Sequence, residues 1–107
     1  MYTKKVNDGY FTKTVNYDKN LAYCPYGSAG IIFNDNGTHL ISYTTTVCSI
    51  DKNGFLSCTG TYSATTRKHI AAFLKEYAPN MCYHDAKKAY ENNYAINIYT
   101  GEIVNYN

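Results

Sequence analysis

The sequence predicts an α+β fold: an antiparallel sheet built from hairpins, with one main amphipathic helix packed on one face and a shorter second helix. Three observations support this. Glycine-terminated turns interrupt alternating sequence in the first half, a helical period follows, and alternation returns near the C-terminus. Runs of strands followed by helices are typical of α+β folds. The length of 107 residues fits a single compact domain, residues 1–107.

Three short turns in the first half of the chain each end in glycine: residues 6–9, 34–37 and 51–54. Each fits a type I turn whose following glycine takes the left-handed conformation in a G1 bulge, which leaves a three-residue loop. The closing pairs would be Val6 with Tyr10, Asn34 with Thr38, and Asp51 with Phe55. Counting outward from the third turn places Ile50 opposite Leu56, Ser49 opposite Ser57 and Cys48 opposite Cys58.

The four cysteines lie at positions 24, 48, 58 and 82, and no two of them form a CxxC pair. Cys48 and Cys58, facing each other across the third hairpin, would lie within the range of a disulfide. Because the sequence shows no secretory signal, we expect both to be reduced thiols. Cys82 and His84 are the one close pair of metal-ligating residues, so a zinc site would need scattered partners. We therefore expect neither a metal nor another cofactor.

A long loop is predicted between the first two hairpins, from Asp18 to Ala29, because Cys24-Pro25-Tyr26-Gly27 places a proline at the second position of a turn. Long loops inside compact domains often carry function, and this one presents Tyr23 and Tyr26. Either the two rings contact a partner, or they lie on the sheet.

The main helix is predicted from about Ala64 to Ala78, with Ser63 as its N-cap and Pro79 preventing continuation. Its apolar positions i, i+3, i+4 and i+7 are Ile70, Phe73, Leu74 and Tyr77.

A second helix is predicted from about Tyr83 to Asn92, ending where Asn92 and Asn93 tolerate a left-handed cap. Its inward-facing residues would be Ala86, Ala89 and Tyr90. Residues 94–99 then alternate, and Thr100-Gly101 offers a two-residue turn into a last strand at 102–106.

The start of the main helix carries hydroxyl and basic side chains where acidic ones are usual. These residues are Ser63, Thr65, Thr66, Arg67, Lys68 and His69, and the first acid of the helix is Glu76. With the free backbone N–H groups of a helix start, they have the composition of an anion site for phosphate or carboxylate. The alternative is an ordinary capped helix whose Arg67 and Lys68 extend into water.

His69 lies on the flank of the apolar stripe. It is expected either to be half-buried and bonded to a strand carbonyl, or to be a secondary contact in the anion site. No nearby residues supply the nucleophile, base and orienting acid of a catalytic triad. We therefore expect a protein that is not an enzyme, and we assign no catalytic residue.

The strand-to-helix segment from Gly60 to Leu74 resembles a family of small uncharacterised proteins from phages and gut bacteria. The shared pattern is Tyr-Ser-x-Thr-Thr-x-x-His-Ile-x-x-Phe, which here is Tyr62, Ser63, Thr65, Thr66, His69, Ile70 and Phe73. The resemblance covers about 20 residues including the preceding hairpin. It implies a phage or mobile-element setting and supplies no established activity.

Composition excludes some classes of function. The formal net charge of +2 gives no long-range field that would by itself imply nucleic acid, and no stretch approaches the roughly 20 apolar residues of a membrane span. The many Asn, Tyr, Lys and Ile residues suggest a low-GC genome, such as that of a phage or a gut Firmicute. We expect the bacterial host cytoplasm as the location.

The leading hypothesis is a small protein that binds a host protein, most concretely an inhibitor of a bacterial immune nuclease, as anti-CRISPR proteins are. A surface rich in Tyr and Asn suits protein contact. The alternative is a nucleic-acid or nucleotide-binding module that uses Arg67, Lys68 and exposed tyrosines. An exposed edge strand could also pair two copies into a homodimer.

Overall fold

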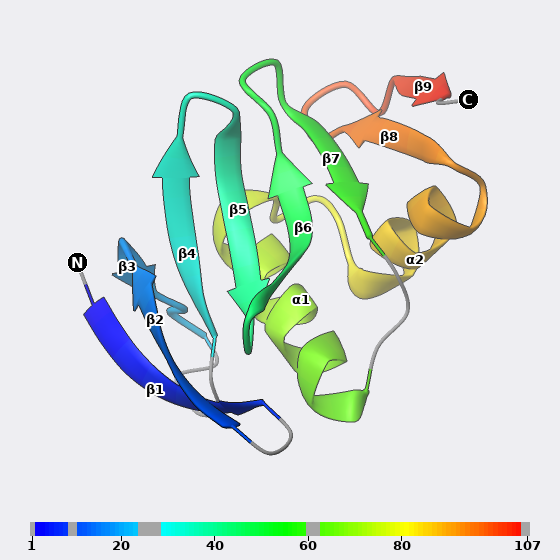
Figure 1. The fold of residues 1–107 in the computed structure, drawn as a ribbon. Helices are drawn as coiled ribbons and strands as arrows, with labels where there is room; N and C mark the ends of the chain where they lie inside the picture. Colours follow the sequence, from blue (N-terminus) through cyan, green and yellow to red (C-terminus); the bar gives the residue numbers. More distant parts are fainter. Residues whose placement is uncertain (1, 9–10, 24–28, 60–62, 106–107) are drawn as a thin grey trace.

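The computed structural model describes residues 2–8, 11–23, 29–59 and 63–105. In these ranges the chain forms nine strands and two helices (Figure 1). They are β1 (Tyr2–Asp8), β2 (Phe11–Tyr17), β3 (Lys19–Asn20), β4 (Ala29–Asn34), β5 (Gly37–Ser42), β6 (Thr45–Ile50), β7 (Phe55–Cys58), α1 (Ala64–Tyr77), α2 (Tyr83–Glu91), β8 (Tyr94–Asn97) and β9 (Ile103–Asn105).

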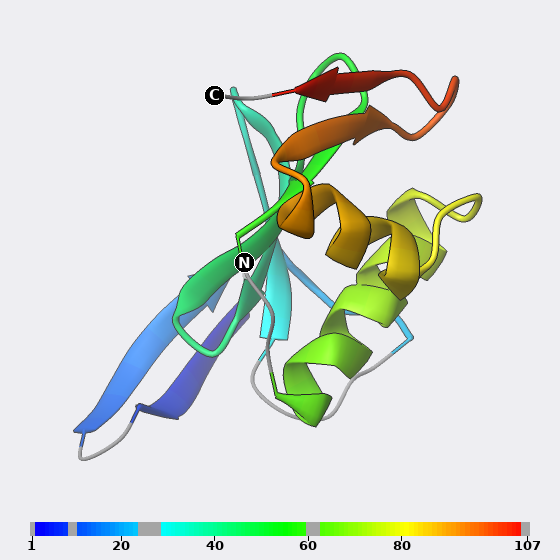
Figure 2. The same ribbon diagram turned by 90° about the vertical axis from the view of Figure 1, so that its right-hand side faces the viewer.

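The main sheet has seven strands in the order β3-β4-β5-β6-β7-β8-β9, and neighbouring strands are antiparallel. Both helices cover one face of this sheet, as Figure 2 shows. The predicted α+β fold is therefore confirmed.

The core lies between the sheet and α1. Leu40, Cys48 and Leu56 from three neighbouring strands join Ile70 and Phe73 of α1 in one buried apolar cluster. Because side chains alternate along a strand, the residues between those strand positions point to the other face of the sheet. We call that side the helix-free face.

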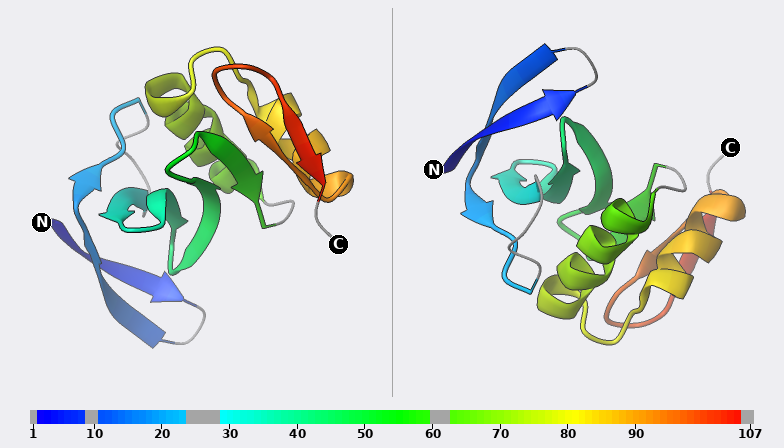
Figure 3. Two further views of the ribbon diagram at one scale, coloured as in Figure 1. Left: turned by 90° about the horizontal axis from the view of Figure 1, so that it is seen from above. Right: turned by 90° about the horizontal axis from the view of Figure 1, so that it is seen from below.

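The β1–β2 hairpin forms a separate two-stranded sheet, on the side of the molecule opposite α2 and β9 (Figure 3). Its backbone pairs Asp8 with Phe11 and Val6 with Lys13, so the predicted pairing of Val6 with Tyr10 is wrong. The last pair of the two strands, Asp8 with Phe11, extends them beyond the predicted closing pair. Residues 9 and 10 themselves lie outside the described ranges.

Tyr17, at the end of β2, attaches this hairpin to the main sheet. Its ring is fully buried against Gly30 of β4. Its hydroxyl donates a hydrogen bond to the backbone carbonyl of Tyr43 at 3.3 Å. Burial raises the pKa of the Tyr17 phenol above its ordinary value.

The 51–54 turn has the predicted geometry. The Asp51 N–H donates to the Phe55 carbonyl at 3.0 Å, and Gly54 has a φ of +88°. The expected pairs, Ile50 with Leu56, Ser49 with Ser57 and Cys48 with Cys58, are confirmed.

The loop of the 34–37 turn has two residues and not the three predicted, so the register of the two strands differs by one residue. Asn34 pairs with Gly37, not with Thr38, and Thr38 pairs with Phe33. This register places Ile31 opposite Leu40, and both side chains are fully buried. A shift by one residue would place half-buried Ile32 opposite Leu40 instead, so core packing decides the register.

Two further predictions about connections need correction. The Asp18–Ala29 segment is not entirely loop, because β3 within it pairs Lys19 with Ile31 of β4. The last hairpin has a four-residue loop from Ile98 to Gly101, because Ile96 pairs with Ile103 and the Asn97 N–H donates to the Glu102 carbonyl at 2.8 Å. The expected two-residue turn would have left Ile98 in a strand, whereas it is buried and donates its N–H to the Gly54 carbonyl.

The helix predictions are close to the structure. Ser63 caps α1 as expected, and Asn93 has the left-handed φ of 55° that ends α2. Ala86 and Ala89 of α2 are buried as predicted, but Tyr90 is 40% exposed and does not face inward. In the described part of the chain, no helix has the length and apolar character needed to span a membrane.

Candidate functional site

The first two turns of α1, residues 63–69, are held in place by an N-cap. Ser63 Oγ accepts a hydrogen bond from the Thr66 N–H at 3.4 Å, and the Ser63 carbonyl accepts the Arg67 N–H at 3.0 Å. The first turn contains no acidic residue. We call this segment the α1 start.

Two of the predicted contact residues in the α1 start point into the protein. Thr66 is 5% exposed and His69 is fully buried. Both contact Ser42 at the end of β5, whose Oγ lies 3.1 Å from Thr66 Oγ1 and 2.9 Å from His69 Nδ1. The expectation of a half-buried His69 is wrong, because its side chain is fully buried and has the Ser42 hydroxyl beside Nδ1. Neither Thr66 nor His69 is accessible to a partner in this structure.

Ser42 was missed by sequence reasoning, because nothing in the sequence marks a serine 27 positions before His69 as its partner. Tyr43, which follows it in the turn between β5 and β6, has a left-handed φ of 58°. Its ring lies tilted against His69, with centroids 6.1 Å apart. Ser42 and His69 lie within hydrogen-bond distance, as a nucleophile and a base would, but both side chains are sealed from substrate.

The other predicted residues of the α1 start face outward. Arg67 and Lys68 are exposed, and Thr65 is half-buried. Among the described residues, neither Arg67 nor Lys68 forms an ion pair with a carboxylate. The split follows from the helical repeat: residues 66 and 69 are three apart and share the inner face, whereas 67 and 68 lie on the outer side.

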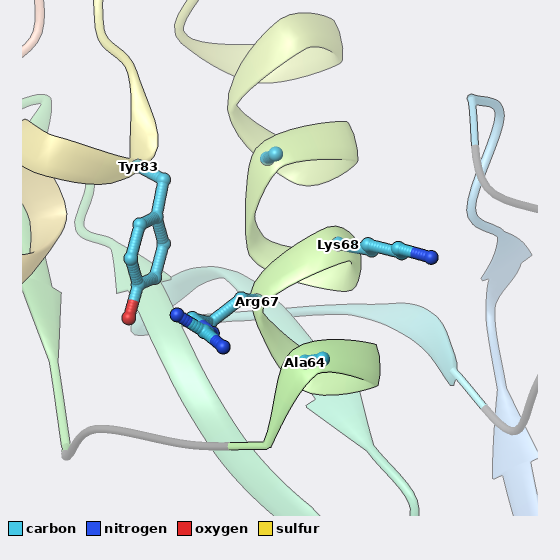
Figure 4. Close-up of a pocket in the computed structure, with 5 residues that line it drawn as sticks. Ala64, Arg67, Lys68 and Tyr83 are labelled. Carbon is cyan, nitrogen blue, oxygen red and sulfur yellow. The ribbon is translucent and has the colours of Figure 1, made fainter.

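Arg67 and Lys68 border a shallow hollow of about 360 Å3 between α1 and α2, whose other lining residues are Ala64, Ala71 and Tyr83. In Figure 4 the Tyr83 ring extends from α2 toward the Arg67 guanidinium, while Lys68 points to the other side of α1. The hollow therefore combines two small apolar side chains and an aromatic ring with the Arg67 guanidinium, and Lys68 borders it while its amine points away. This combination suits an extended segment of a partner that carries carboxylate or phosphate groups.

The segment that carries Tyr23, the other predicted contact region, lies away from the α1 start. Tyr23 is 55% exposed, and Lys75 Nζ lies 4.5 Å from its ring centroid. Glu76 accepts the Ala22 N–H at 3.3 Å and forms an ion pair with Lys19, which ties this segment to the second half of α1. Since Lys75 lies eight positions after Arg67 in the helix, the two candidate contact regions lie about 12 Å apart along the helix axis. Tyr26 lies outside the described residues.

The cysteine pair is assembled as predicted. Cys48 is fully buried, Cys58 is half-buried, and both are free thiols. A hydrogen bond with the Cys58 side chain, together with burial, raises the pKa of Cys48 well above its ordinary value. In the described ranges no three His, Cys, Asp or Glu side chains come together in a way that could hold a metal ion.

Comparison with known proteins gives one result. A family model described as a family of unknown function (DUF8033) matches residues 11–92. No curated protein and no solved structure matches the chain. The match includes the α1 start and both helices.

Proposed function

Since the chain belongs to this family of unknown function, we propose from its surface that it is a binding protein, which docks the outer side of the α1 start onto an acidic surface of a host protein. The contact residues are Arg67 and Lys68, with Ala71 and Tyr83 forming the apolar part of the interface.

One observation carries this proposal: two adjacent exposed cations stand at the positive end of α1 without a carboxylate partner among the described residues. Helix dipoles disfavour cations there by about 0.3–1 kcal/mol each. Two lysines elsewhere in the chain are engaged, since Lys19 pairs with Glu76 and Lys75 lies over the Tyr23 ring. Carboxylates supplied by a partner would offset this local cost by pairing with the two cationic side chains.

In its most concrete form, the target is a bacterial immune nuclease in the host cytoplasm, which the chain would inhibit as anti-CRISPR proteins do. The resemblance of the Gly60–Leu74 segment to phage and gut-bacterial proteins supports this setting. Nuclease centres that use metal ions are lined with carboxylates, which are suitable partners for Arg67 and Lys68. The net charge of +2 does not favour inhibition by imitation of the polyanionic backbone of nucleic acid.

The test is a capture experiment from bacterial lysate with three tagged proteins: the wild type, Arg67→Glu/Lys68→Glu, and Lys52→Glu/Lys87→Glu. The last is a matched control, because it makes the same charge change at two exposed lysines outside the hollow. We expect one partner to be enriched by the wild type and the control, and lost with the α1 variant. Equal capture by all three, or no enrichment over an unrelated protein, would contradict the proposal.

Nucleic-acid or nucleotide binding is the second candidate, supported by the aromatic ring of Tyr83 next to the Arg67 guanidinium (Figure 4). Arginine and aromatic side chains together bind phosphates and stack on bases. This candidate predicts affinity for single-stranded DNA that falls steeply between about 50 and 200 mM salt. Absence of binding at the lower salt concentration removes it.

Self-association is a further candidate, supported by β9. This strand lies at one edge of the seven-stranded sheet and exposes Ile103 and Val104 by 50% and 46%. Exposed apolar edge strands can pair with a second copy. The Ile103→Lys variant should then lower the mass measured by light scattering from that of a dimer to that of a monomer, and a wild type that is monomeric at all concentrations argues against the pairing.

A further inference from the structure

The helix-free face of the sheet carries a chain of three polar side chains from neighbouring strands. His39 of β5 lies between Asn34, at the end of β4, and Ser49 of β6. The distance from His39 Nε2 to Asn34 Oδ1 is 2.9 Å, and the distance from His39 Nδ1 to Ser49 Oγ is 2.6 Å. The sheet register fixes this arrangement, because His39 pairs directly with Ser49.

The direction of these hydrogen bonds can be derived from the Asn34 side chain. Its Oδ1 also accepts the backbone N–H of Asn36 at 2.8 Å, so this atom is the acceptor oxygen and not the amide nitrogen. His39 must therefore carry its proton on Nε2, and its Nδ1 presents a lone pair. In the neutral imidazole, Ser49 is then the donor of the short hydrogen bond to Nδ1. This is the order of orienting group, base and nucleophile found in triads of hydrolytic enzymes.

Ser49 also lines a hollow of about 210 Å3 on the same face, together with Asp51, Phe55, Ser57, Ala95 and Val104. Ser57 lies directly across the strand pair from Ser49. The hollow thus offers a serine with a hydrogen-bonded imidazole, a second hydroxyl beside it and apolar walls. The Ser42–His69 pair has the same kind of contact and lacks such a hollow, because both side chains are buried.

We propose that Ser49 is a nucleophile that accepts acyl groups from small neutral esters, with His39 as its general base and Asn34 as a positioning residue. The hollow holds only a short acyl chain, and the Asp51 carboxylate at its wall disfavours anionic substrates. This site lies on the opposite face of the sheet from the helices and is independent of the binding function proposed above.

The reaction has two balanced steps. Ser49 Oγ attacks the ester carbonyl carbon, its proton passes to His39 Nδ1, and the carbonyl oxygen takes the negative charge within reach of a Ser57 O–H donor. The C–O bond to the alcohol then breaks, and the alcohol leaves with the proton from His39, giving an ester on Ser49. Water, deprotonated by His39, attacks this ester, and Ser49 Oγ leaves with that proton, releasing the carboxylic acid and the free serine.

The test uses a fluorophosphonate probe on the full chain, with the labelled serines identified by peptide mass spectrometry. Ser63 is an internal control for an exposed serine without an imidazole, and Ser42 is one for a histidine-bonded serine without access. We expect labelling of Ser49 to be at least about tenfold faster than that of Ser63, in line with the usual contribution of a general base, and Ser42 to remain unlabelled. Labelling of Ser49 no faster than that of Ser63 overturns the proposal.

Variants of His39 and Asn34 show whether Ser49 is labelled fast because the imidazole activates it or only because it is exposed. His39→Gln keeps an amide that can bond to Asn34 and Ser49 but cannot act as a base at neutral pH, so Ser49 labelling should fall to the Ser63 rate while the thermal melt is unchanged. Asn34→Ala should slow labelling, and Asn34→Asp should restore it because a carboxylate orients the imidazole in the same way. Hydrolysis of p-nitrophenyl acetate should follow the same order. Unchanged labelling in His39→Gln, with the protein folded, would refute the assigned base.

Discussion

Gly30→Ala tests how the β1–β2 hairpin is joined to the main sheet. A Cβ at this position would lie 2.2 Å from Tyr17 Cγ and 2.5 Å from Cδ1. Carbon atoms in contact stand about 3.5–4.0 Å apart, so the Tyr17 ring would have to move by more than about 1 Å. The φ of Gly30 lies outside the left-handed region, so alanine is allowed by the backbone and the cost is steric. Overpacking costs about 1–3 kcal/mol, and loss of a buried aromatic ring costs about 3–5 kcal/mol. We expect a loss of about 2–4 kcal/mol, between these two cases.

The assay is urea denaturation followed by circular dichroism, in which this loss should lower the midpoint by about 1–2 M if the slope is typical for a small protein. The decisive control is the same substitution in a Tyr17→Ala background. There the ring is absent, and alanine in a strand is about 0.5–1 kcal/mol better than glycine, so Gly30→Ala should be neutral or stabilising. An equal loss in both backgrounds, or a loss below about 0.5 kcal/mol in the wild type, would refute the reasoning.

Two further predictions concern titration and oxidation. Burial raises the pKa of Tyr17 and Tyr77. Unfolded tyrosine ionises at about pH 10, so above this pH the native state retains more protons than the unfolded state. The free energy of unfolding should therefore fall as the pH rises. Tyr17→Phe should reduce this fall, because it removes one of the two phenols. A fall that is as steep in the variant as in the wild type contradicts the assignment. Treatment with oxidised glutathione should join Cys48 to Cys58 in a disulfide and lower the mass by two hydrogen atoms. The disulfide closes a short loop, so it should stabilise the protein by about 2–3 kcal/mol. If both thiols can still be alkylated in the native protein after this treatment, the pair cannot form the bond.

The elements of the fold could be predicted from the sequence because each is set by local chemistry. The apolar period of α1, its Ser63 cap and Pro79 after its end define a helix that the structure places at Ala64–Tyr77. The Asp51–Gly54 turn fixes its own register, because the Asp51 carboxylate accepts the backbone N–H groups of Asn53 and Phe55, both at 2.9 Å. Such contacts span four residues or fewer and are visible in the sequence.

The registers that failed depend on contacts between distant residues. In the second hairpin the turn residues allow two loop lengths, and the buried pair Ile31 and Leu40 selects one of them. In the last hairpin the Ile98 N–H bonds to the Gly54 carbonyl, which holds Ile98 out of the strand and lengthens the loop. Turn patterns carry no information about either contact, so local rules give the existence of a hairpin more reliably than its register.

The candidate site shows the same division. The charge pattern located Arg67 and Lys68, and the structure leaves both exposed. The same pattern grouped Thr66 and His69 with them, although a helix turns these two inward to meet Ser42. Thr66 and His69 lie on the same inner face of α1 as the buried apolar residues Ile70, Phe73 and Leu74. The charge pattern of the sequence does not distinguish this inner face from the outer side that carries the two cations.

The two serine–histidine pairs of this protein show why hydrogen-bond distance alone does not identify a reactive serine. Ser42 and His69 are 2.9 Å apart, and Ser49 and His39 are 2.6 Å apart. The first pair is buried between α1 and β5, where the hydrogen bonds position a helix. The second lies on the helix-free face beside a hollow large enough for a small ester. Because neighbouring residues of a strand point to opposite faces of the sheet, the strand pair β5 and β6 carries one serine–histidine contact on each face. An experiment that measures the labelling of Ser42 and Ser49 separately therefore shows the effect of probe access to the serine, because each serine lies within hydrogen-bond distance of a histidine.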